Sequence, residues 1–285
     1  MAAPGDQRPQ SLIISIFGAY GRNIGGWLSV SALVSLLNDV GVDDPAVRSA
    51  LSRFKRRGVL LSEKHNGVAG YALSESTWRT FDVGDARVLQ RRTPPPNAGW
   101  VLTAFSIPES KRDLRYRLRS RLAKVGFAQV GGGLWIAPRA LEADARYIVE
   151  ALGLQEHVDI FNAEHTAFRT TAGAVNQWWD LPAIASEYES FTKDFKSLCA
   201  AYDRAAKPPT PASAFADYTR ALTAWRPLPY NDPGLPRDYL PKVWPGDQAT
   251  ELFYALHDQL AHLAQQHVVN VVEGFSGESA NSRTS

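Results

Sequence analysis

The 285-residue chain has little sulfur, with one cysteine, Cys199, and one methionine. A single cysteine excludes an internal disulfide framework and any zinc site built from cysteines. No apolar run approaches the roughly 20 residues that a membrane-spanning helix needs. The first ten residues are polar and contain proline, unlike a signal peptide. We therefore expect a cytoplasmic protein without a membrane segment.

Signatures of common catalytic and cofactor sites are also missing. The sequence has no Gly-x-Ser-x-Gly elbow, phosphate-binding loop or dinucleotide fingerprint. His257, His262 and His267 are five residues apart, which places successive rings about 140° apart on a helix rather than on one face. Asp180 follows two tryptophans and is more typical of a helix N-cap than of a general acid. We expect no catalytic residue, no bound metal and no cofactor.

Residues 44–58 are the most informative segment that is present. Asp44 as N-cap, Pro45 as first helical residue and Gly58 as the stop predict a short helix. Its apolar residues fall on one face, at Val47, Ala50, Leu51 and Phe54. The opposite face is basic and bears hydroxyls, at Arg48, Ser49, Ser52, Arg53 and Arg56. Such a face suits the major groove of DNA, although taken alone it is equally typical of a solvated surface helix.

The neighbouring segments favour the first interpretation. A helical apolar run at 11–20, an extended piece at 27–29 and a helix at 30–40, capped by Ser29 or Ser31, precede the basic helix by a short turn. Two extended runs follow it, at 59–64 and 68–73, and Asn66-Gly67 between them is a strong hairpin signal. This order predicts a winged helix-turn-helix, and with it nucleic-acid binding.

The rest of the chain predicts two further parts. A helix at 73–92 ends before a proline-rich linker at 93–97. The central part has the order strand, helix, strand, strand, helix, strand, at 100–107, 111–125, 127–130, 134–137, 139–152 and 158–162. That order is ferredoxin-like. The last third is helical, at 181–202, 215–225 and 250–268. The fold class is therefore α+β, with a winged-helix domain at 1–92, a ferredoxin-like domain at 98–172, a helical domain at 176–273 and a disordered tail at 274–285.

Several features have two interpretations. The triple glycine at 131–133 lies between two predicted strands, which favours a hairpin turn over a phosphate-binding loop. The arginine-rich helix at 111–125 is either a solvated face or a secondary contact for the DNA backbone or an anionic ligand. The aromatic stripe at 181–202 is more typical of a core than of a ligand site. Residues 1–92 carry 12 Lys and Arg against 8 Asp and Glu, whereas residues 152–285 carry 10 against 16. A basic front fits a protein that presents its first half to phosphates.

These motifs resemble the PaaX family of bacterial phenylacetic-acid-type repressors. The similarity lies in the opening helix SLIISIFGAY at 11–20, in VRSALSR at 47–53 with Arg57-Gly58, and in YALS at 71–74. It continues in WDL at 179–181, NDPGLP at 231–236 and LPKVWPG at 240–246. The motifs occur in the family's order over nearly the whole chain.

The resemblance implies a homodimeric transcriptional repressor of a catabolic, phenylacetate-type operon. Its partners would be double-stranded operator DNA, a second copy of the chain, and an aryl-acyl-CoA effector such as phenylacetyl-CoA, whose contact residues the family motifs do not define. The expected DNA contacts are Arg48, Ser49, Ser52, Arg53, Lys55, Arg56, Arg57, His65 and Asn66. The alternative is an enzyme that cleaves nucleic acid with its ferredoxin-like domain, although the strand at 100–107 lacks the expected aspartate. A protein-interaction module with a degenerate winged helix is a third hypothesis.

Overall fold

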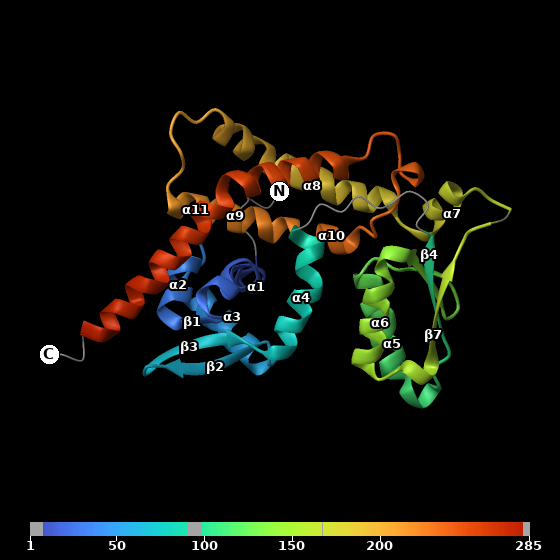
Figure 1. Cartoon of the computed structure of the whole chain (residues 1–285), viewed down its shortest axis with the longest axis horizontal. Helices are drawn as coiled ribbons and strands as arrows, with labels where there is room; N and C mark the ends of the chain where they lie inside the picture. The colour runs from blue at the N-terminus through green and yellow to red at the C-terminus, as the bar shows by residue number, and fades with distance from the viewer. Residues whose placement is uncertain (1–7, 90–98, 167, 282–285) are drawn as a thin grey trace. The chain divides into compact units, whose positions relative to one another are not determined.

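A computed structural model describes residues 8–89, 99–166 and 168–281, without the side chains of 82–86 and 276–281. Helices and two small sheets make an α+β protein, as predicted (Figure 1). The chain divides into two compact units that interleave along the sequence. Unit 1 comprises residues 1–86, 191–225 and 249–285, and unit 2 comprises residues 87–190 and 226–248. The predicted linker at 93–97 lies outside the described residues.

Unit 1 begins with three helices and a three-stranded sheet. These helices are α1 (Pro9–Tyr20), α2 (Val30–Asp39) and α3 (Asp44–Arg56). The sheet has the order β1-β3-β2, from β1 (Trp27–Ser29), β2 (Leu60–His65) and β3 (Val68–Leu73), all antiparallel. The predicted elements are present in the predicted order, and α4 (Glu75–Leu89) follows them.

Local side chains set the ends of these helices. Ser29 caps α2 by accepting a hydrogen bond from the Ala32 amide at 3.0 Å, which decides between the two serines considered. The predicted N-cap of α3 was wrong by one residue. Asp43 is extended and accepts from the Ala46 amide at 2.8 Å, whereas Asp44 is already helical. Gly58 ends α3 in the left-handed conformation, with φ of 68°, and the next amide reaches back to the Phe54 carbonyl.

The C-terminal helices also contribute to unit 1. They are the last part of α8 (Leu181–Asp203), α9 (Pro211–Trp225) and most of α11 (Pro245–Asn281). In their core Trp225 stacks on Phe253 and Phe191 packs tilted against Trp225, which supports the interpretation of the α8 aromatic stripe as core. Helix α11 continues well past residue 268, through part of the segment predicted as a tail.

Two buried hydrogen bonds fasten α1 to α9. The Thr223 hydroxyl donates to Ser15 at 2.8 Å, and the hydroxyls of Tyr20 and Thr219 are 3.3 Å apart. All four side chains are buried, and leaving one of them unpaired would cost roughly 1–3 kcal/mol. The first and last thirds of the sequence therefore share one core, which local sequence patterns did not reveal.

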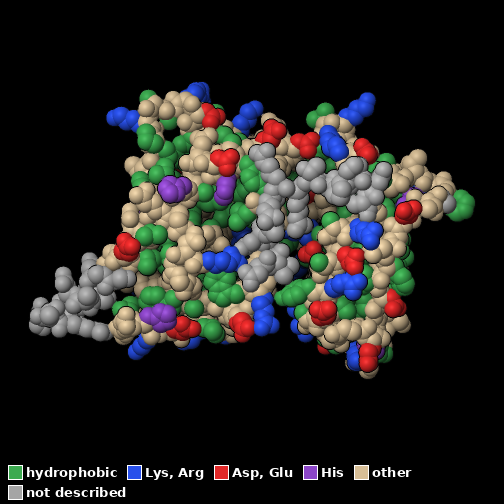
Figure 2. Space-filling model, in the orientation of Figure 1, with side chains coloured by type: hydrophobic (Ala, Val, Ile, Leu, Met, Phe, Trp, Pro, Cys, Tyr) green, Lys and Arg blue, Asp and Glu red, His purple; other side chains and the backbone are tan. Residues whose placement is uncertain are grey.

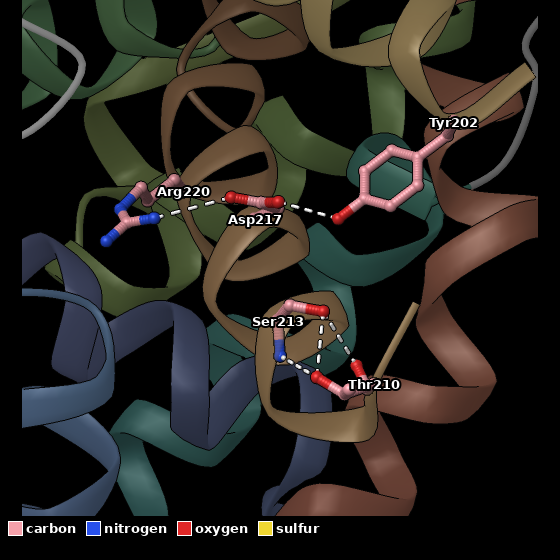
Figure 3. Close-up of polar contacts among 5 residues, drawn as sticks. All are labelled: Tyr202, Thr210, Ser213, Asp217 and Arg220. Atoms are coloured by element: carbon pink, nitrogen blue, oxygen red, sulfur yellow. Dashed lines mark hydrogen bonds and ion pairs between the residues drawn. The ribbon is translucent and has the colours of Figure 1, made fainter. Parts of the chain in front are cut away.

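The connection from α8 to α9 is held by polar contacts (Figure 3). Thr210 caps α9 by accepting from the Ser213 amide at 3.2 Å. One turn along α9, the two carboxylate oxygens of Asp217 bind different partners, the Tyr202 hydroxyl at 2.6 Å and the Arg220 guanidinium at 3.4 Å. Asp217 thereby ties the end of α8 to α9.

Unit 2 contains a four-stranded antiparallel sheet with helices on one face (Figure 1). Its elements follow one another as β4 (Trp100–Phe105), α5 (Arg112–Lys124), β5 (Ala128–Gly131), β6 (Leu134–Pro138), α6 (Glu142–Leu152) and β7 (Val158–Ala163). The strand order is β5-β6-β4-β7. Alternate strand residues such as Val101 and Trp135 face α5 and α6, and Leu118 and Leu122 of α5 meet them in the core.

The triple glycine connects β5 to β6, as the hairpin interpretation predicted. Gly132 has a φ of 50°, and a side chain at Gly133 would come within 2.3 Å of the Phe105 carbonyl oxygen. Glycine is therefore required at this turn for steric reasons, because only glycine has no Cβ. Helix α7 (Thr171–Trp178), which the sequence patterns did not predict, follows β7.

A buried arginine organises the centre of unit 2. The Arg87 guanidinium donates to the carbonyls of Pro229 at 2.6 Å, Val125 at 2.8 Å and Asp232 at 3.2 Å. It also lies 3.8 Å from the Asp144 carboxylate. The side chain is only 4% exposed, so these contacts replace the water that a buried charge loses. The loop at 226–236, which includes the short helix α10 (Leu228–Asn231), is thus fixed to the helix layer.

Candidate nucleic-acid interface

Helix α3 separates an apolar face from a polar one. Val47, Ala50, Leu51 and Phe54 are buried, with no more than 6% of any side chain exposed. These are the four residues that the helical periodicity placed on the apolar face, so that prediction is confirmed. Burial of this face fixes the rotation of α3 about its axis, and the opposite face must point outward.

All nine residues predicted to contact DNA are exposed. Arg48, 65% exposed, lies 4.0 Å from Asp44, a separation that leaves the guanidinium free to bind another anion. Arg53 donates to the Ser49 hydroxyl at 3.0 Å. Within the part of the chain that the structure describes, Lys55, Arg56 and Arg57 have no acidic partner. Positive charge on this face is therefore available to a ligand.

The turn before α3 holds it at a fixed angle to α2. Four residues separate the two helices, and Gly41 among them has a φ of 88°. The Asn38 side-chain amide donates to the Asp44 carboxylate at 3.1 Å across the turn. Contacts of this kind orient α3 without using its outward side chains.

The β2–β3 hairpin lies next to α3 in the sequence and carries the other two predicted residues. Asn66 and Gly67 both have positive φ, 51° and 85°, as a tight type I′ turn requires. The His65 ring stacks on Trp27, with 4.5 Å between ring centroids, and reaches the Glu63 carboxylate at 3.1 Å. Its ring is therefore oriented by the sheet, although it stays half exposed.

Lys64 is a basic residue near the hairpin tip that sequence reasoning missed. It pairs with Ala69 across the hairpin, and its side chain is exposed. The signal was available in the sequence, because a lysine two residues before an Asn-Gly turn places a charge near the tip.

A groove adjoins the basic face of α3 within unit 1. It has a volume of about 390 Å³, and its lining includes Val34 and Asn38 of α2, Arg48 of α3 and Phe275 of α11. Helix α11 is joined to α2 by a 2.8 Å contact between His267 and Asp39. The C-terminal helix thus reaches the neighbourhood of the candidate interface, which sequence reasoning did not anticipate.

Two of the three histidines of α11 make separate contacts. His257 shares a 2.7 Å hydrogen bond with the Tyr218 hydroxyl, and burial lowers the pKa of this histidine. His267 contacts Asp39, as described above. Among the described residues, no group of three or more His, Cys, Asp or Glu side chains is arranged to hold a metal ion. Asp180 caps α8 by accepting from the Ala183 amide at 3.1 Å, the role expected of it.

Charge on the protein surface is mixed, so any nucleic-acid surface must be local. Figure 2 shows Lys and Arg side chains mixed with Asp and Glu side chains over the face in view. The formal net charge is +2, so a nucleic-acid surface must come from particular helices. None of the helices in the described ranges is long and apolar enough to pass through a bilayer.

Comparisons with protein families cover most of the sequence. Residues 8–77 match the family described as PaaX-like protein. Residues 93–175 match the PaaX protein central Cas2-like domain, and residues 179–270 match the PaaX-like protein C-terminal domain. The three matches follow one another in the order that the motifs indicated.

Two individual proteins are similar over nearly their full length. The transcriptional repressor PaaX of Escherichia coli (strain K12) is 26% identical over 271 residues, which cover 94% of this chain and 85% of that protein. The solved structure of the uncharacterized protein Rv0674 from Mycobacterium tuberculosis has a TM-score of 0.52 and 21% identity. The match covers 92% of this chain and 98% of the Rv0674 chain. At this identity the likeness shows a shared fold alone.

Proposed function

The chain belongs to the PaaX family, and from this premise we propose that it is a transcriptional repressor that binds duplex operator DNA through helix α3. The observation that carries the proposal is the outward basic face of α3, held by a buried apolar face on the opposite side. The similarity to a transcriptional repressor supports the same function.

In this proposal α1 to α3 and the β2–β3 hairpin form a winged helix-turn-helix. Arg48, Ser52 and Arg56 lie about 40° apart around α3 and would face base edges in the major groove. The flanking residues Ser49, Arg53, Lys55 and Arg57 would bind phosphates. His65 and Asn66 at the hairpin tip would contact the adjacent backbone or minor groove, with Lys64 beside them.

The remaining parts of the proposal concern assembly and control. The unit 2 sheet, whose four strands and two helices follow a β-α-β-β-α-β order, would be the ferredoxin-like central domain. Two copies of the chain would bind a two-fold-related operator in the cytoplasm. An aryl-acyl-CoA thioester, with phenylacetyl-CoA as the first candidate, would relieve repression of a catabolic operon by favouring a conformation with lower DNA affinity.

No observation favours the alternative of a nucleic-acid-cleaving enzyme. Strand β4 contains no acidic residue. Glu109, the first acid after β4, is paired with Arg115 at 2.6 Å. The similarity to a transcriptional repressor also points away from an enzyme. A magnesium-dependent cleavage assay on duplex DNA separates the two functions.

A gel-shift experiment tests the proposed function directly. The probe is the DNA upstream of the chain's own gene cluster, with and without a panel of aryl-CoA thioesters. We expect a salt-sensitive complex that one or more thioesters weaken. Absence of any salt-sensitive DNA complex would leave the protein-interaction hypothesis, and a complex that no thioester changes would remove the effector from the proposal.

A further inference from the structure

Helix α5 in unit 2 has a second basic surface. Its apolar stripe is anchored in the unit 2 core through Leu118 and Leu122, which are fully buried. The opposite side, which we call the α5 outer face, is solvent-facing and carries the exposed residues Arg112, Asp113, Tyr116, Arg117, Arg119 and Lys124. The prediction from sequence left open whether these basic residues are a solvated face or a contact surface.

Basic residues of the α5 outer face differ from other arginines of unit 2 in their ion pairing. Arg115 is paired with Glu109 at 2.6 Å and Arg146 with Glu142 at 2.8 Å. In contrast, Arg112, Arg117 and Lys124 have no acidic partner among the residues that the structure describes. Arg119 donates to the neutral amide oxygen of Gln129 at 2.8 Å. Asp113 is the one acid within α5, so the surface keeps a positive excess.

Arg112 contributes to the positive charge of the α5 outer face from an unusual position in the helix. It is the first residue of α5, where the positive end of the helix dipole disfavours an arginine. The dipole of α5 therefore does not favour this arginine, and its side chain is exposed.

The length of the α5 outer face spans several phosphates of a DNA strand. Tyr116 lies between the basic residues and is 74% exposed, and its hydroxyl is of the kind that binds phosphate oxygens. From Arg112 to Lys124 the surface is about 18 Å long, at about 1.5 Å per residue, and one DNA strand places a phosphate about every 3.4 Å. Because α6 packs along α5 over the sheet, α5 cannot enter a major groove about 12 Å wide by itself. Helix α5 could therefore contact the DNA backbone but not read the bases.

We infer that the α5 outer face is a second DNA-binding surface, which contacts phosphates of duplex DNA through Arg112, Arg117 and Lys124 in addition to the base-reading contacts of α3. This inference rests on the proposed function. Unit 2 would then supply a share of the DNA affinity that does not depend on base sequence. Duplex DNA is the expected partner because a cationic face without acidic partners is complementary to a regular polyanion.

The test measures binding of the full chain to a mixed-sequence duplex, a probe for which no operator needs to be known. Fluorescence anisotropy over a series of salt concentrations gives the slope of log K against log salt. The variant Arg112→Ala/Arg117→Ala/Lys124→Ala is compared with Lys193→Ala/Lys196→Ala/Lys207→Ala, which removes three exposed lysines from unit 1 residues and lowers the net charge equally. Circular dichroism checks that both variants are folded.

We expect the α5 variant to bind at least tenfold more weakly and to lose about 3 from the magnitude of the salt slope, because each lost phosphate contact removes about 1. The lysine control should keep nearly the wild-type slope. The charge-keeping variant Arg112→Lys/Arg117→Lys should also keep it, and it guards against a folding artefact.

Two results would overturn the inference. One is a wild-type slope in the α5 variant, which would leave the surface as a solvated face or a site for an acidic protein. The other is an equal loss in the α5 variant and the lysine control, which would indicate an effect of net charge. Failure of wild-type protein to bind any duplex would instead contradict the proposed function, so the two failures are distinguishable.

Discussion

Helices α3 and α5 are alike in composition and different in surroundings. Each is 13 residues long, and each carries a basic side chain at the first, sixth and eighth places counted from Arg48 or Arg112. Helix α3 stands between a short turn and a hairpin, with an exposed outward face that borders a groove at Arg48, whereas α5 lies on a sheet beside α6. The comparison teaches that two helices with similar basic spacing can differ in what they could contact, because the neighbouring elements decide whether a helix can reach base edges.

The largest expected effect concerns the buried faces. Phe54→Ala should destabilise unit 1 by about 3–5 kcal/mol, and Leu118→Ala should destabilise unit 2 by about 2–5 kcal/mol, because each removes a fully packed side chain. Chemical denaturation followed by tryptophan fluorescence measures both. If the two units are independently stable, each variant lowers the denaturation midpoint of one unit only. A single shared transition would show that the two units unfold together.

The next effect separates base reading from phosphate contact. Arg48→Ala or Arg56→Ala should weaken operator binding by about 1–3 kcal/mol and relax base preference, because the base-edge contact proposed for that arginine is lost. Lys55→Ala should instead weaken binding to all sequences alike and lower the salt slope by about 1. Binding to the operator and to scrambled duplexes measures the difference. Equal specificity loss in all three variants would contradict the division of roles within α3.

A smaller effect concerns the helix starts. Asp43→Ala should cost unit 1 about 1 kcal/mol, because it leaves the Ala46 amide without its acceptor. The matching position before α5, Lys111, makes no side-chain cap, so Lys111→Ala should leave unit 2 stability nearly unchanged. Thermal unfolding of the two variants measures this. A larger loss from Lys111→Ala would mean that its 2.9 Å contact with His157 matters more than a cap.

The smallest effect is a difference in pH response between the two units. Burial lowers the pKa of His257 in unit 1 below its ordinary 6.5, so this contribution to stability is present above pH 6.5 and is lost as the pH falls through the lowered value. In unit 2, the hydrogen bond from Arg146 lowers the pKa of Glu142 below 4.5, and its contribution persists to more acidic pH. Denaturation midpoints between pH 7 and pH 4 measure this. His257→Gln should flatten the response above pH 5, and an unchanged response would assign it to another group.

Much of the local structure could be predicted from the sequence. The buried residues of α3 follow from its helical period, and the hairpin at Asn66-Gly67 follows from the positive φ that this pair tolerates. The β-α-β-β-α-β order of unit 2 follows from alternating apolar periods and glycine stops. The cap at Asp43 was missed by one residue, because two adjacent aspartates present the same signal and only backbone geometry distinguishes them.

The candidate nucleic-acid interface was also predictable only in part. The exposure of Arg48, Ser52 and Arg56 could be predicted, because it depends on which side of one helix is apolar. The orientation of His65 by Trp27, and the groove that Phe275 lines together with Arg48, could not be predicted. Both depend on contacts between residues far apart in the chain, for which the sequence carries no periodic signal.

Local periodicity and capping chemistry, which act within a few residues, determined the helices, the hairpin and the outward basic faces of α3 and α5. Only the tertiary structure decided that α9 completes the core around α1, through Ser15, Thr223, Tyr20 and Thr219, and that Arg87 is buried against three carbonyls. The reason is that a buried polar group gains its partners only when distant segments meet, so its role depends on the assembled core rather than on its neighbours in the chain.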